Sequence, residues 1–545
     1  MSRLTETNTD PCKAAQIYQL NNLPLPLYAD NNHVGQAFYP VEGLINFYKL
    51  PKVLEILRCA CDTCKVDRKY FPKSIGAESF GQKVVEAGVR LFALLVHIRH
   101  PALILGFAQR AQNAIEQPST ISNDDLAKKY WATFHRKSSD HFRALVSEFQ
   151  SYKHQFEAPE LDGTYQELDR DAILPFANEK KIGSGSYGTV YRFDIPSAHC
   201  QKFPGPSRPA WNHIIARSGD RQYRCVTYAR KELSSERYQD FWRETENLLR
   251  VRDILNSENI VSILKAYRRG DKFSILFPYA NMNLKQFLEE HNTEYRDAAL
   301  ELDEIWLQVR GISEALSNIA ELNDGGSQSL TTTSTWFGCH FDLKPANILI
   351  FGNGVWKIAD FGQAAFKARQ GTDSRMTDEG GSDAYSAPET DTDERSGPRY
   401  DVWSLGCIIL EVTTFLVMGR RGLMGPDGLT ELRKSSERRG SNSRLWRRLD
   451  DGTFIVKPKV EEFMQQLSTK RPPDTDSPRF LKLIMKLIKE MLDPRVASRR
   501  DANGVVQEIR HIIATSKQQE GVLLSQSQIY DGERRMGHKL LSGLR

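Results

Sequence analysis

Apolar side chains recur at the spacing of an α-helix in several long stretches of the chain. Two of these stretches lie early, one from Ser79 to a stop at Pro101 and one from His141 to Phe156. Their apolar positions form single stripes, which predict helices that bury one face in a core. Further helices are predicted downstream, over Phe241–Leu255, Leu302–Leu322, Asp401–Phe415, Phe480–Met491 and Ala502–Ile513. By contrast, residues 1–50 show little periodicity and several Pro, Asn and Asp residues, so we expect an irregular segment there.

Short apolar runs bounded by turn-forming residues predict strands among the later helices. These runs are Val190–Phe193, Cys225–Lys231, Phe273–Phe277 and Ile348–Ile350. Acidic residues with a proline and a glycine occupy 157–171, which predicts a linker. Two polar stretches, the proline-bearing 196–224 and the Gly/Ser/Thr-rich 325–335, predict loops on the surface.

The composition excludes several classes of protein. With 545 residues, of which 40% are hydrophobic and 26% charged, the chain is long enough to bury a large core and to hold more than one domain. Lys plus Arg exceeds Asp plus Glu by five (74 − 69), which is too weak an excess over this length to indicate nucleic-acid binding. The eight cysteines are irregularly spaced, which fits a reducing compartment better than a disulfide framework.

The sequence also argues against secretion and against a membrane span. The first residues, Met1–Cys12, are polar and lack the apolar core of a signal peptide. The most apolar window, Val89–Phe107, is interrupted by charged residues, histidines and a proline, so it predicts a buried helix. We therefore expect a soluble intracellular protein, in the cytoplasm by default and with the nucleus left open.

Three cysteines, Cys59, Cys61 and Cys64, lie close together in the N-terminal region. Three thiolates at this spacing are able to ligate zinc if Cys12 or a histidine supplies a fourth ligand. No second cysteine pair follows downstream to complete the usual zinc knuckle. We therefore favour the interpretation that these cysteines end a helix predicted over Val53–Arg58, and metal content would decide between the two.

One part of the chain carries the groups that phosphoryl transfer from ATP requires. The segment His340–Asn347 is followed, after a short strand, by Asp360-Phe361-Gly362. Asp342 is able to orient an attacking hydroxyl and to accept its proton. Lys344 is able to neutralise charge that develops on the transferred phosphoryl group. Asn347 and Asp360 offer hard oxygen ligands suited to Mg²⁺ on nucleotide phosphates.

These two segments resemble the catalytic loop and the metal-binding triplet of the eukaryotic protein kinases. In having a lysine two residues after Asp342, the segment is similar to the serine/threonine branch of that family. The resemblance implies ATP and Mg²⁺ as cofactors and the Ser and Thr hydroxyls of proteins as acceptors. It implies catalytic roles for Asp342, Lys344, Lys231 and Glu244, and metal ligation by Asn347 and Asp360.

The same resemblance implies an α+β fold with the two lobes of a kinase. A small β-rich lobe is expected over 173–280 and a large helical lobe over 281–515. The region before them, 1–172, is expected to be mainly helical with an acidic linker, a layout similar to that of fungal kinases with a helical N-terminal region. This region is a candidate for binding another protein, and 516–545 is expected to be a disordered tail.

A glycine-rich hairpin is predicted near the start of the small lobe. The spacing of its glycines lets backbone amides lie over ATP phosphates, since any Cβ would hold the loop away from them. A dinucleotide fold gives the same spacing, but it requires a helix directly after the glycines, and here a strand follows. The nucleotide-binding residues expected in this hairpin are Ile182, Gly183, Ser184, Gly185, Ser186, Tyr187, Gly188, Thr189 and Val190.

Further nucleotide contacts follow from the resemblance. Ala229 matches the small residue that packs on adenine, and Lys231 matches the lysine that holds the α- and β-phosphates. Arg230, between them, is expected to point outward from the alternating strand. Lys231 needs a carboxylate partner, for which Glu244 is preferred by its helical position and Glu246 is the alternative. Adenine and ribose contacts are expected from Pro278, Ala280, Asn283 and Leu349.

Two residues of the catalytic segment depart from the family pattern. Gly338 stands where an apolar residue usually precedes the histidine, and Phe341 replaces the arginine that usually follows it. That arginine ordinarily binds a phosphate on the activation segment, so its absence predicts activity that phosphorylation there does not control. The resemblance also implies three contacts in the large lobe, namely Ser382 with Asp342 and Lys344, Glu389 with Arg499, and Asp401 with the catalytic-loop amides.

Three other functions compete with a protein kinase. A nucleotide-binding pseudokinase could act as an adaptor through residues 1–172, but such proteins usually lack one of the four catalytic and metal-binding residues found here. A small-molecule phosphotransferase would share the catalytic segment but lack Ala387-Pro388-Glu389 and the Asp401 helix. A binding module built on the cysteine cluster would make no use of the phosphoryl-transfer groups.

Overall fold

The structure of the chain is a computed structural model. It describes residues 10–26, 37–68, 77–108, 118, 121, 126, 139–158, 161, 164–185, 188–199, 213–218, 221–255, 257–290, 302–323, 335–352, 354–368, 382–392, 397–434, 443–470 and 478–520. The chain forms two compact units. Unit 1 consists of Met1–Glu236 with Leu264–Phe277, and unit 2 consists of Arg237–Ile263 with Pro278–Arg545. Both units contain helices and strands, which confirms the predicted α+β class.

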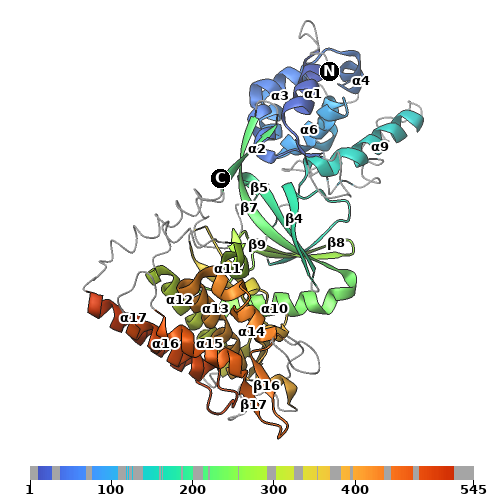
Figure 1. Cartoon of the computed structure of the whole chain (residues 1–545). Coiled ribbons are helices and arrows are strands. Elements are labelled where there is room, and N and C mark those ends of the chain that lie inside the picture. Colours follow the sequence, from blue (N-terminus) through green and yellow to red (C-terminus); the bar gives the residue numbers. More distant parts are fainter. Residues whose placement is uncertain are drawn as a thin grey trace, which may run out of the picture. The chain divides into compact units, whose positions relative to one another are not determined.

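Helices make up the first part of unit 1 (Figure 1). They are α1 (Pro11–Asn22), α2 (Val41–Phe47), α3 (Leu50–Leu57), α4 (Asp62–Arg68), α5 (Ala77–Lys83), α6 (Val89–His97), α7 (Ile104–Ala108) and α9 (Ser139–Phe156), with a two-residue pairing of β1 (Leu25–Pro26) and β2 (Ala37–Phe38). A π-helical turn, Val84–Gly88, joins α5 to α6. The two early helices predicted from the apolar stripes are therefore confirmed, and the first ends before Pro101.

The prediction that residues 1–50 are irregular was wrong, because α1 and α2 lie there. The face that α1 buries carries Cys12, Ala15, Gln16 and Gln19, so polar residues interrupt the apolar period. Gln19 Nε2 donates to the Ala93 carbonyl at 3.2 Å in the middle of α6, and its Oε1 accepts the Tyr48 hydroxyl. These bonds satisfy a buried amide, which lets a polar side chain occupy a core position.

The second part of unit 1 is a seven-stranded sheet, as counted over the described residues. Its order is β3-β8-β9-β7-β5-β4, with β6 paired to β7. The strands are β3 (Tyr165–Leu168), β4 (Ala177–Gly185), β5 (Gly188–Pro196), β6 (His213–Ser218), β7 (Arg221–Ser234), β8 (Lys265–Arg269) and β9 (Lys272–Pro278). Strand β3 pairs parallel to β8, so the stretch predicted to be a linker adds an edge strand to the sheet.

Arg230 does not point into solvent, contrary to the prediction for this position. It is buried, with 5% of the residue exposed, and its guanidinium pairs with Glu179 at 2.5 Å and with Glu232 at 3.3 Å. The guanidinium also lies over the ring of Phe176 at 5.7 Å. The reason is that residues ahead of the sheet, including Leu174 and Phe176, cover its second face with a hydrophobic cluster.

The predicted surface loop 196–224 is partly ordered structure. Its described end forms the hairpin of β6 and β7, and Tyr223 is buried with Leu25, Phe38 and Cys225 where the helices meet the sheet. The Tyr223 hydroxyl donates to the Leu23 carbonyl at 3.1 Å. The insert therefore fastens the helical part of unit 1 to its sheet, and residues 200–212 lie outside the described residues.

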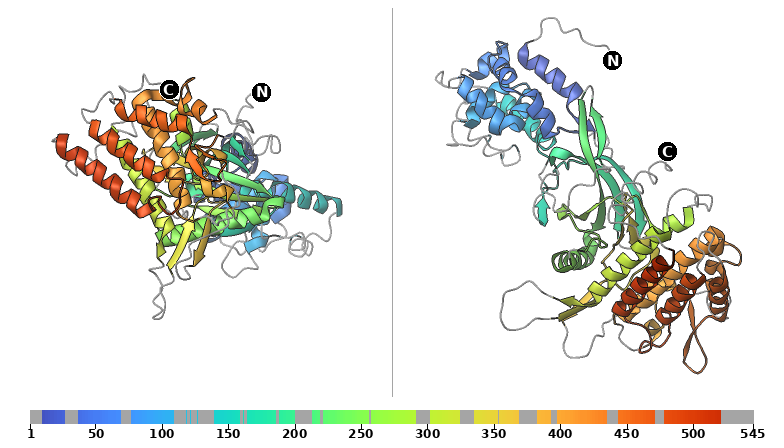
Figure 2. Two further views of the ribbon diagram at one scale, coloured as in Figure 1. Left: turned by 60° about the horizontal axis from the view of Figure 1, so that its bottom comes forward. Right: turned by 90° about the vertical axis from the view of Figure 1, so that its left-hand side faces the viewer.

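Unit 2 is dominated by helices that lie side by side (Figure 2). They are α10 (Tyr238–Leu255), α11 (Leu284–Glu290), α12 (Leu302–Ala320), α13 (Arg399–Met424), α14 (Leu429–Lys434), α15 (Pro458–Thr469), α16 (Pro478–Met491) and α17 (Ala502–Glu520). The helices predicted from the apolar period in this part are confirmed, although α17 continues to Glu520, beyond the expected end at Ile513. The prediction of a disordered tail was therefore wrong for residues 516–520, and residues 521–545 lie outside the described residues.

Short strands carry the catalytic segments of unit 2. One sheet has the order β10 (Met282–Asn283), β13 (Ile348–Ile350), β14 (Trp356–Ile358), and another has the order β11 (Leu322–Asn323), β12 (Thr335–Cys339), β15 (Ala365–Ala368). A third pairs β16 (Trp446–Arg448) with β17 (Phe454–Val456). Residues 324–334, most of the predicted Gly/Ser/Thr-rich loop, lie outside the described residues.

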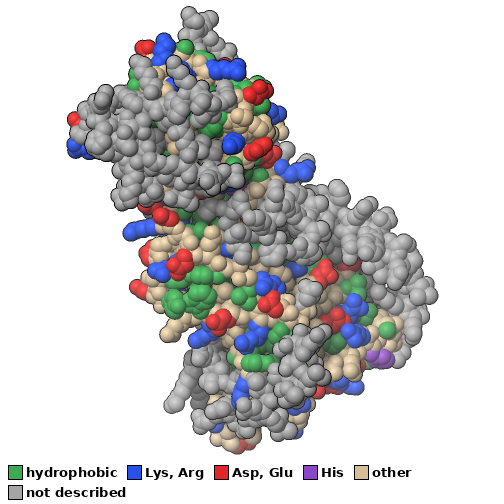
Figure 3. Space-filling view, turned by 180° about the vertical axis from the view of Figure 1, so that it is seen from behind, with side chains coloured by type: hydrophobic (Ala, Val, Ile, Leu, Met, Phe, Trp, Pro, Cys, Tyr) green, Lys and Arg blue, Asp and Glu red, His purple; other side chains and the backbone are tan. Residues whose placement is uncertain are grey.

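One described helix, α13, is long and apolar enough to cross a membrane by length and composition alone. Of its most apolar window, 72% is buried inside the protein, as is usual for the core helix of a large domain, so it is weak evidence for a span. Basic and acidic side chains lie interspersed over the described part of the face in Figure 3. That distribution agrees with the small net charge.

The buried position of Arg230 gives a prediction about stability. Arg230→Met leaves the carboxylate of Glu179 buried without its main cation, so we expect a loss of about 3–5 kcal/mol in the free energy of unfolding. Burial already raises the pKa of Glu179 from 4.5, and loss of Arg230 raises it further. The deficit should therefore shrink as the pH falls from neutral toward 4.5, where the protonated form is tolerated in the core.

Urea unfolding followed by tryptophan fluorescence across this pH range measures the effect. Arg224→Met, an exposed arginine on the same strand, is the matched control and should change stability by less than about 0.5 kcal/mol. A deficit for Arg230→Met that matches this control, or that grows as the pH falls, would contradict the assignment.

Candidate active site

Four predicted residues of unit 2 form one hydrogen-bonded network. Lys344 Nζ donates to Asp342 Oδ2 at 2.6 Å and to Ser382 Oγ at 2.7 Å. The Ser382 amide donates to Asp342 Oδ1 at 2.9 Å. Asn347 Nδ2 donates to the Asp342 carbonyl at 2.8 Å and to its Oδ2 at 3.1 Å. Ser382 thus links Asp342 and Lys344 as expected, although its bond to Asp342 comes from the backbone amide and not from the hydroxyl.

Asp401, in the first turn of α13, binds the backbone of the segment that carries Asp342. Its two carboxylate oxygens accept the amides of His340 at 2.6 Å and Phe341 at 2.9 Å. Asp401 is 1% exposed, so these bonds lie where water does not compete with them. They hold Phe341 at a φ of 62°, a backbone conformation that non-glycine residues rarely adopt. Asp401 therefore occupies the predicted position under the catalytic-loop amides.

The two expected metal ligands lie at the ends of neighbouring strands. Asn347 precedes β13 and Asp360 follows β14, and these strands pair antiparallel. The Ala359 amide donates to the Asn347 carbonyl at 2.8 Å, and His340 Nε2 donates to the Ala359 carbonyl at 3.0 Å. These bonds bring the residue before Asp360 against the catalytic segment. Asp360 itself has a φ of 65°, so its backbone is set in the left-handed region.

The structure distinguishes the two candidate carboxylates of α10. Glu244 is 2% exposed, whereas Glu246 on the same helix is exposed. A Cβ built on Gly362 would lie 3.6 Å from Glu244 Oε2 and 3.6 Å from Asp360 Oδ1, so Glu244 faces the Asp360–Gly362 segment. Asn247 strengthens this contact because its Nδ2 donates to the Phe361 carbonyl at 3.0 Å. Of the two candidates on α10, Glu244 is thus the one whose carboxylate is directed at the site.

Both departures from the family pattern have a packing reason. A side chain at Gly338 would meet the Phe366 ring at 2.5 Å and the Ile319 carbonyl at 2.9 Å, so this position of β12 has no room for one. Phe341 is buried, and its ring packs edge-on against Tyr400 with centroids 5.3 Å apart. An aromatic pair therefore occupies the position at which a phosphate-binding arginine was expected.

The nucleotide-binding residues predicted on unit 1 lie on paired strands. The glycine segment forms a hairpin of β4 and β5, as predicted, and Gly185 pairs with Gly188 at its tip. Gly188 has a φ of 131°, and a Cβ there would come within 2.6 Å of the Glu232 carbonyl, so only glycine fits. Val190 lies directly opposite Lys231 in the sheet, which puts their side chains on one face. Ser186 and Tyr187 lie outside the described residues.

The next strand contributes the remaining expected contact of unit 1. Ala229 on β7 pairs with Arg192 and is partly exposed, unlike the buried Tyr228 and Arg230 on either side of it. Because side chains alternate along a strand, Ala229 and Lys231 share the face on which the hairpin glycines were predicted to act.

The residues expected to meet adenine and ribose surround β10 in unit 2. Pro278 and Ala280 are partly exposed. Asn283 pairs with Leu349, whose partly exposed side chain points away from the core that Ile348 and Ile350 enter. Asn283 Oδ1 accepts the Gln286 amide at 2.9 Å and so caps α11. This atom therefore has a structural task, and the predicted ribose contact of Asn283 remains a prediction.

Glu389 and Arg499 form the expected ion pair. Two bonds join the groups, Nη1 to Oε1 at 2.7 Å and Nη2 to Oε2 at 2.9 Å, and the two side chains are 5% and 0% exposed. Arg499 also donates to the Arg399 carbonyl at 2.9 Å and lies over the Trp403 ring at 5.2 Å. A bidentate and fully bonded pair of this kind ties the end of the activation segment to α13.

Comparison with known protein families agrees with this geometry. The model of the protein kinase domain matches residues 216–508, more than half of the chain. The chain belongs to the protein kinase family. The match runs from within β6 to within α17 and includes Lys231, Glu244 and the whole network around Asp342.

Curated relatives of the kinase are similar over part of their length. Serine/threonine-protein kinase ICK of Rattus norvegicus is 33% identical over 178 residues, which are 32% of this chain and 24% of that protein. Cyclin-dependent kinase-like 5 of Mus musculus is 25% identical over 232 residues, 43% of this chain and 20% of that protein. Serine/threonine-protein kinase Tao of Drosophila melanogaster is 27% identical over 258 residues, 47% of this chain and 20% of that protein. The chain thus spans about a quarter or less of these relatives, all from animals, and the expected likeness to fungal kinases stays a prediction.

Sequence reasoning missed the contacts that the kinase makes behind its activation segment. Arg444 pairs with Asp383 at 2.5 Å and with Asp391 at 2.7 Å, and Trp446 Nε1 donates to the Ser386 carbonyl at 2.9 Å. The partners lie more than fifty positions apart in the chain, so no local spacing could have indicated them. The strand pair β16–β17 therefore supports the segment that carries Ser382.

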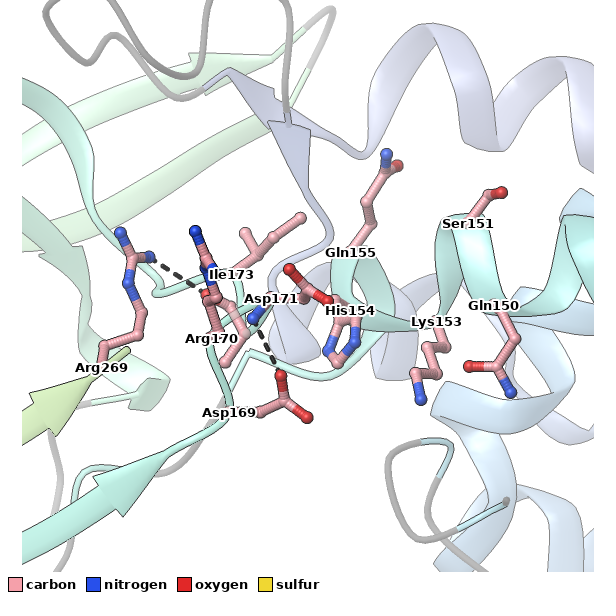
Figure 4. A pocket seen from close by; sticks show the side chains of 11 residues that line it. Gln150, Ser151, Lys153, His154, Gln155, Asp169, Arg170, Asp171, Ile173 and Arg269 are labelled. Atoms are coloured by element: carbon pink, nitrogen blue, oxygen red, sulfur yellow. Dashed lines mark hydrogen bonds between the residues drawn. The ribbon is translucent and has the colours of Figure 1, made fainter. Parts of the chain in front are cut away.

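A separate hollow of about 390 Å³ lies in unit 1, between α9 and the residues that follow β3 (Figure 4). Its walls carry Lys153, His154, Asp169 and Arg170. Burial lowers the pKa of His154. Arg269 closes one side, where its Nη1 donates to the Ala172 carbonyl at 3.1 Å. The predicted catalytic and nucleotide-binding residues do not line this hollow.

The ion pair of Glu389 and Arg499 gives a second prediction about stability. Glu389→Gln leaves the guanidinium buried without its counter-charge, so we expect a loss of about 3–5 kcal/mol in the free energy of unfolding. Glu431→Gln is the control, because Glu431 pairs with Lys434 on the surface, with 46% and 51% of the side chains exposed, and should cost at most about 1 kcal/mol. Equal urea midpoints for the two variants would contradict the structural role of the buried pair.

Proposed function

We propose that this protein is a serine/threonine kinase that transfers the γ-phosphate of Mg-ATP to protein hydroxyls. The observation that carries the proposal is the network in which Asp342, Lys344, Asn347 and Ser382 contact one another. Asp342, Lys344 and Asn347 each have a distinct task in phosphoryl transfer, and Ser382 helps to hold Asp342 and Lys344 in position.

Asp342 acts on the incoming hydroxyl. Its carboxylate is 5% exposed and is bonded by Lys344, Asn347 and the Ser382 amide, so it cannot rotate freely. A carboxylate held this way orients the acceptor oxygen and takes its proton as the bond to phosphorus forms. Lys344 Nζ bridges Asp342 and Ser382 and keeps a positive charge where negative charge develops on the transferred group.

The donor set fits a hard cation. Because Asn347 gives its amide nitrogen to Asp342, its side-chain oxygen is the atom presented to a ligand. Together with the Asp360 carboxylate it offers the all-oxygen ligation that Mg²⁺ prefers. Bound Mg²⁺ would supply charge compensation for the nucleotide phosphates. The hairpin amides around Gly183 and Gly185, and the ammonium of Lys231, are the groups of unit 1 that bind phosphates.

The serine/threonine specificity is supported by Lys344 and by the names of the relatives, since ICK and Tao are described as serine/threonine-protein kinases. The competing function is a nucleotide-binding pseudokinase that acts as an adaptor through residues 1–172. It is disfavoured because Lys231, Asp342, Asn347 and Asp360 are all present. We further propose an intracellular location, protein substrates, and a second protein as a partner of the N-terminal region.

Phosphate transfer from labelled ATP to a generic protein substrate tests the proposal. Asp342→Asn removes the proton acceptor and Lys231→Met removes the phosphate contact, so each variant should lose activity by about 100-fold or more. The controls are Asp450→Asn and Lys180→Met, both exposed positions that should keep full activity. Activity that persists in both catalytic variants would point to a contaminant or to another phosphotransferase, and ATP binding without any transfer by the wild type would favour the adaptor.

Phe341 predicts how the activity responds to phosphatase. Its buried contact with Tyr400 replaces the arginine that would read an activation-segment phosphate, so turnover should be the same before and after dephosphorylation. Mass spectrometry of the intact chain verifies that phosphate has been removed, and a phosphatase-sensitive kinase treated in parallel shows that the treatment works. A large loss of turnover in this protein would refute the prediction.

A further inference from the structure

The four cysteines of the N-terminal region come together, although one is far from the others in the chain. Cys12 lies in the first turn of α1, and Cys59, Cys61 and Cys64 lie between the end of α3 and the first turns of α4. Their sulfur atoms all lie within 4.8 Å of one another. Cys12 Sγ is 3.5 Å from Cys59 Sγ and 3.6 Å from Cys61 Sγ. All four are free cysteines.

These distances distinguish between a disulfide, a single tetrahedral metal ion and an iron–sulfur cluster with several irons. A disulfide requires sulfurs about 2 Å apart, so none of the measured pairs is bonded. Four thiolates around one tetrahedral ion, with Zn–S bonds of about 2.3 Å, would have their sulfurs about 3.8 Å apart. Iron–sulfur clusters with several irons spread their cysteine ligands over different metal atoms, which requires wider spacing than this cluster shows.

We propose that Cys12, Cys59, Cys61 and Cys64 bind one structural Zn²⁺ ion. Each thiol gives its proton to solvent as its sulfur binds the metal, so no electron transfer and no further reactant is needed. The site is closed, with four protein ligands and no position for substrate, which is the arrangement of structural zinc sites and not of catalytic ones.

The surroundings of the sulfurs are suited to such a site. Cys12, Cys59 and Cys64 are buried and Cys61 is partly exposed, so an ion has a path in from solvent. The Cys64 amide points at Cys61 Sγ, 3.5 Å away, as backbone amides do toward metal-bound thiolates. Arg68 bonds the carbonyls of Leu57 and Cys59 and thereby holds the turn that carries two ligands.

The basic residues beside the cysteines and the packing of α1 indicate the structural role of the ion. A basic residue, Lys13, Arg58 or Lys65, directly adjoins three of the four cysteines and offsets the negative charge of a zinc–tetrathiolate centre. Helix α1 buries small and polar residues in its first turns, and its aromatic contact, Tyr18 stacked on Phe47, lies further along, so apolar packing at its N-terminal end is limited. Zinc would fix its first turn to the junction of α3 and α4, a role that hydrophobic contact fills elsewhere in the fold.

Metal analysis of the untagged 545-residue chain tests the site independently of kinase activity. Purification without added metal should yield about one zinc per chain. Cys61→Ser, which changes the most exposed ligand, should lower that content at least several-fold. Cys225→Ser is the matched control, since Cys225 is a buried cysteine outside the cluster and forms no disulfide, and should leave the zinc content unchanged. Less than about 0.1 zinc per chain in the wild type, iron in place of zinc, or an unchanged content in Cys61→Ser would overturn the proposal.

Cobalt substitution in the wild-type chain keeps the proposal falsifiable if Cys61→Ser fails to fold. Co²⁺ in a tetrahedral site of four sulfurs gives intense visible bands and a strong sulfur-to-metal charge-transfer band. We expect this spectrum at one equivalent of Co²⁺ and its loss on addition of one equivalent of Zn²⁺. A weak spectrum typical of six oxygen or nitrogen ligands, or no displacement by zinc, would show that the cysteines do not form the site.

Discussion

The buried carboxylate of Asp342 is the group on which the candidate active site of this kinase-family protein depends. A carboxylate that is 5% exposed is stable only if its charge is paired and its oxygens are bonded. Lys344 supplies the charge, and Asn347 and the Ser382 amide supply further bonds. The contacts that make this buried carboxylate stable are therefore the same contacts that align the residues proposed to carry out phosphoryl transfer.

The residues that support Asp342 form a closed series of contacts that ends where it began. Asp401 holds the amides just before Asp342 and belongs to the first turn of α13. Two residues later on that helix, Trp403 lies under Arg499, which binds Glu389 at the end of the activation segment. Ser382, seven residues before Glu389 in the same segment, donates its amide to Asp342. Loss of one buried member leaves its partner's charge or bond unmet, so the catalytic loop, α13 and the activation segment stabilise one another.

The sequence predicted the parts of this structure whose signals are local. The helices with an unbroken apolar stripe, such as α9 and α16, and the hairpin of glycines followed their expected patterns. Local sequence patterns failed to predict the structure where a segment distant in the chain completes a hydrophobic core. Helix α1 was missed because Gln19 finds its partners on α2–α3 and α6, and Arg230 was expected outside because nothing near it in sequence reveals the cluster around Phe176. The candidate catalytic residues could be named from the sequence because family motifs specify their residue types and spacing, whereas the supporting contacts of Arg444 and Trp446 could not.

The N-terminal helices are joined to the sheet of unit 1 more closely than the acidic stretch 157–171, predicted to be a linker, had indicated. Strand β3 joins the sheet, and the hairpin of β6 and β7 carries Tyr223 into the contact with Leu23. Strand β7 then runs without interruption from Arg221 to Ser234. One end of a single strand is thus buried against the N-terminal helices and the other end carries Lys231. Close-packed interiors transmit strain, so a displacement of those helices meets a continuous strand that also carries Lys231.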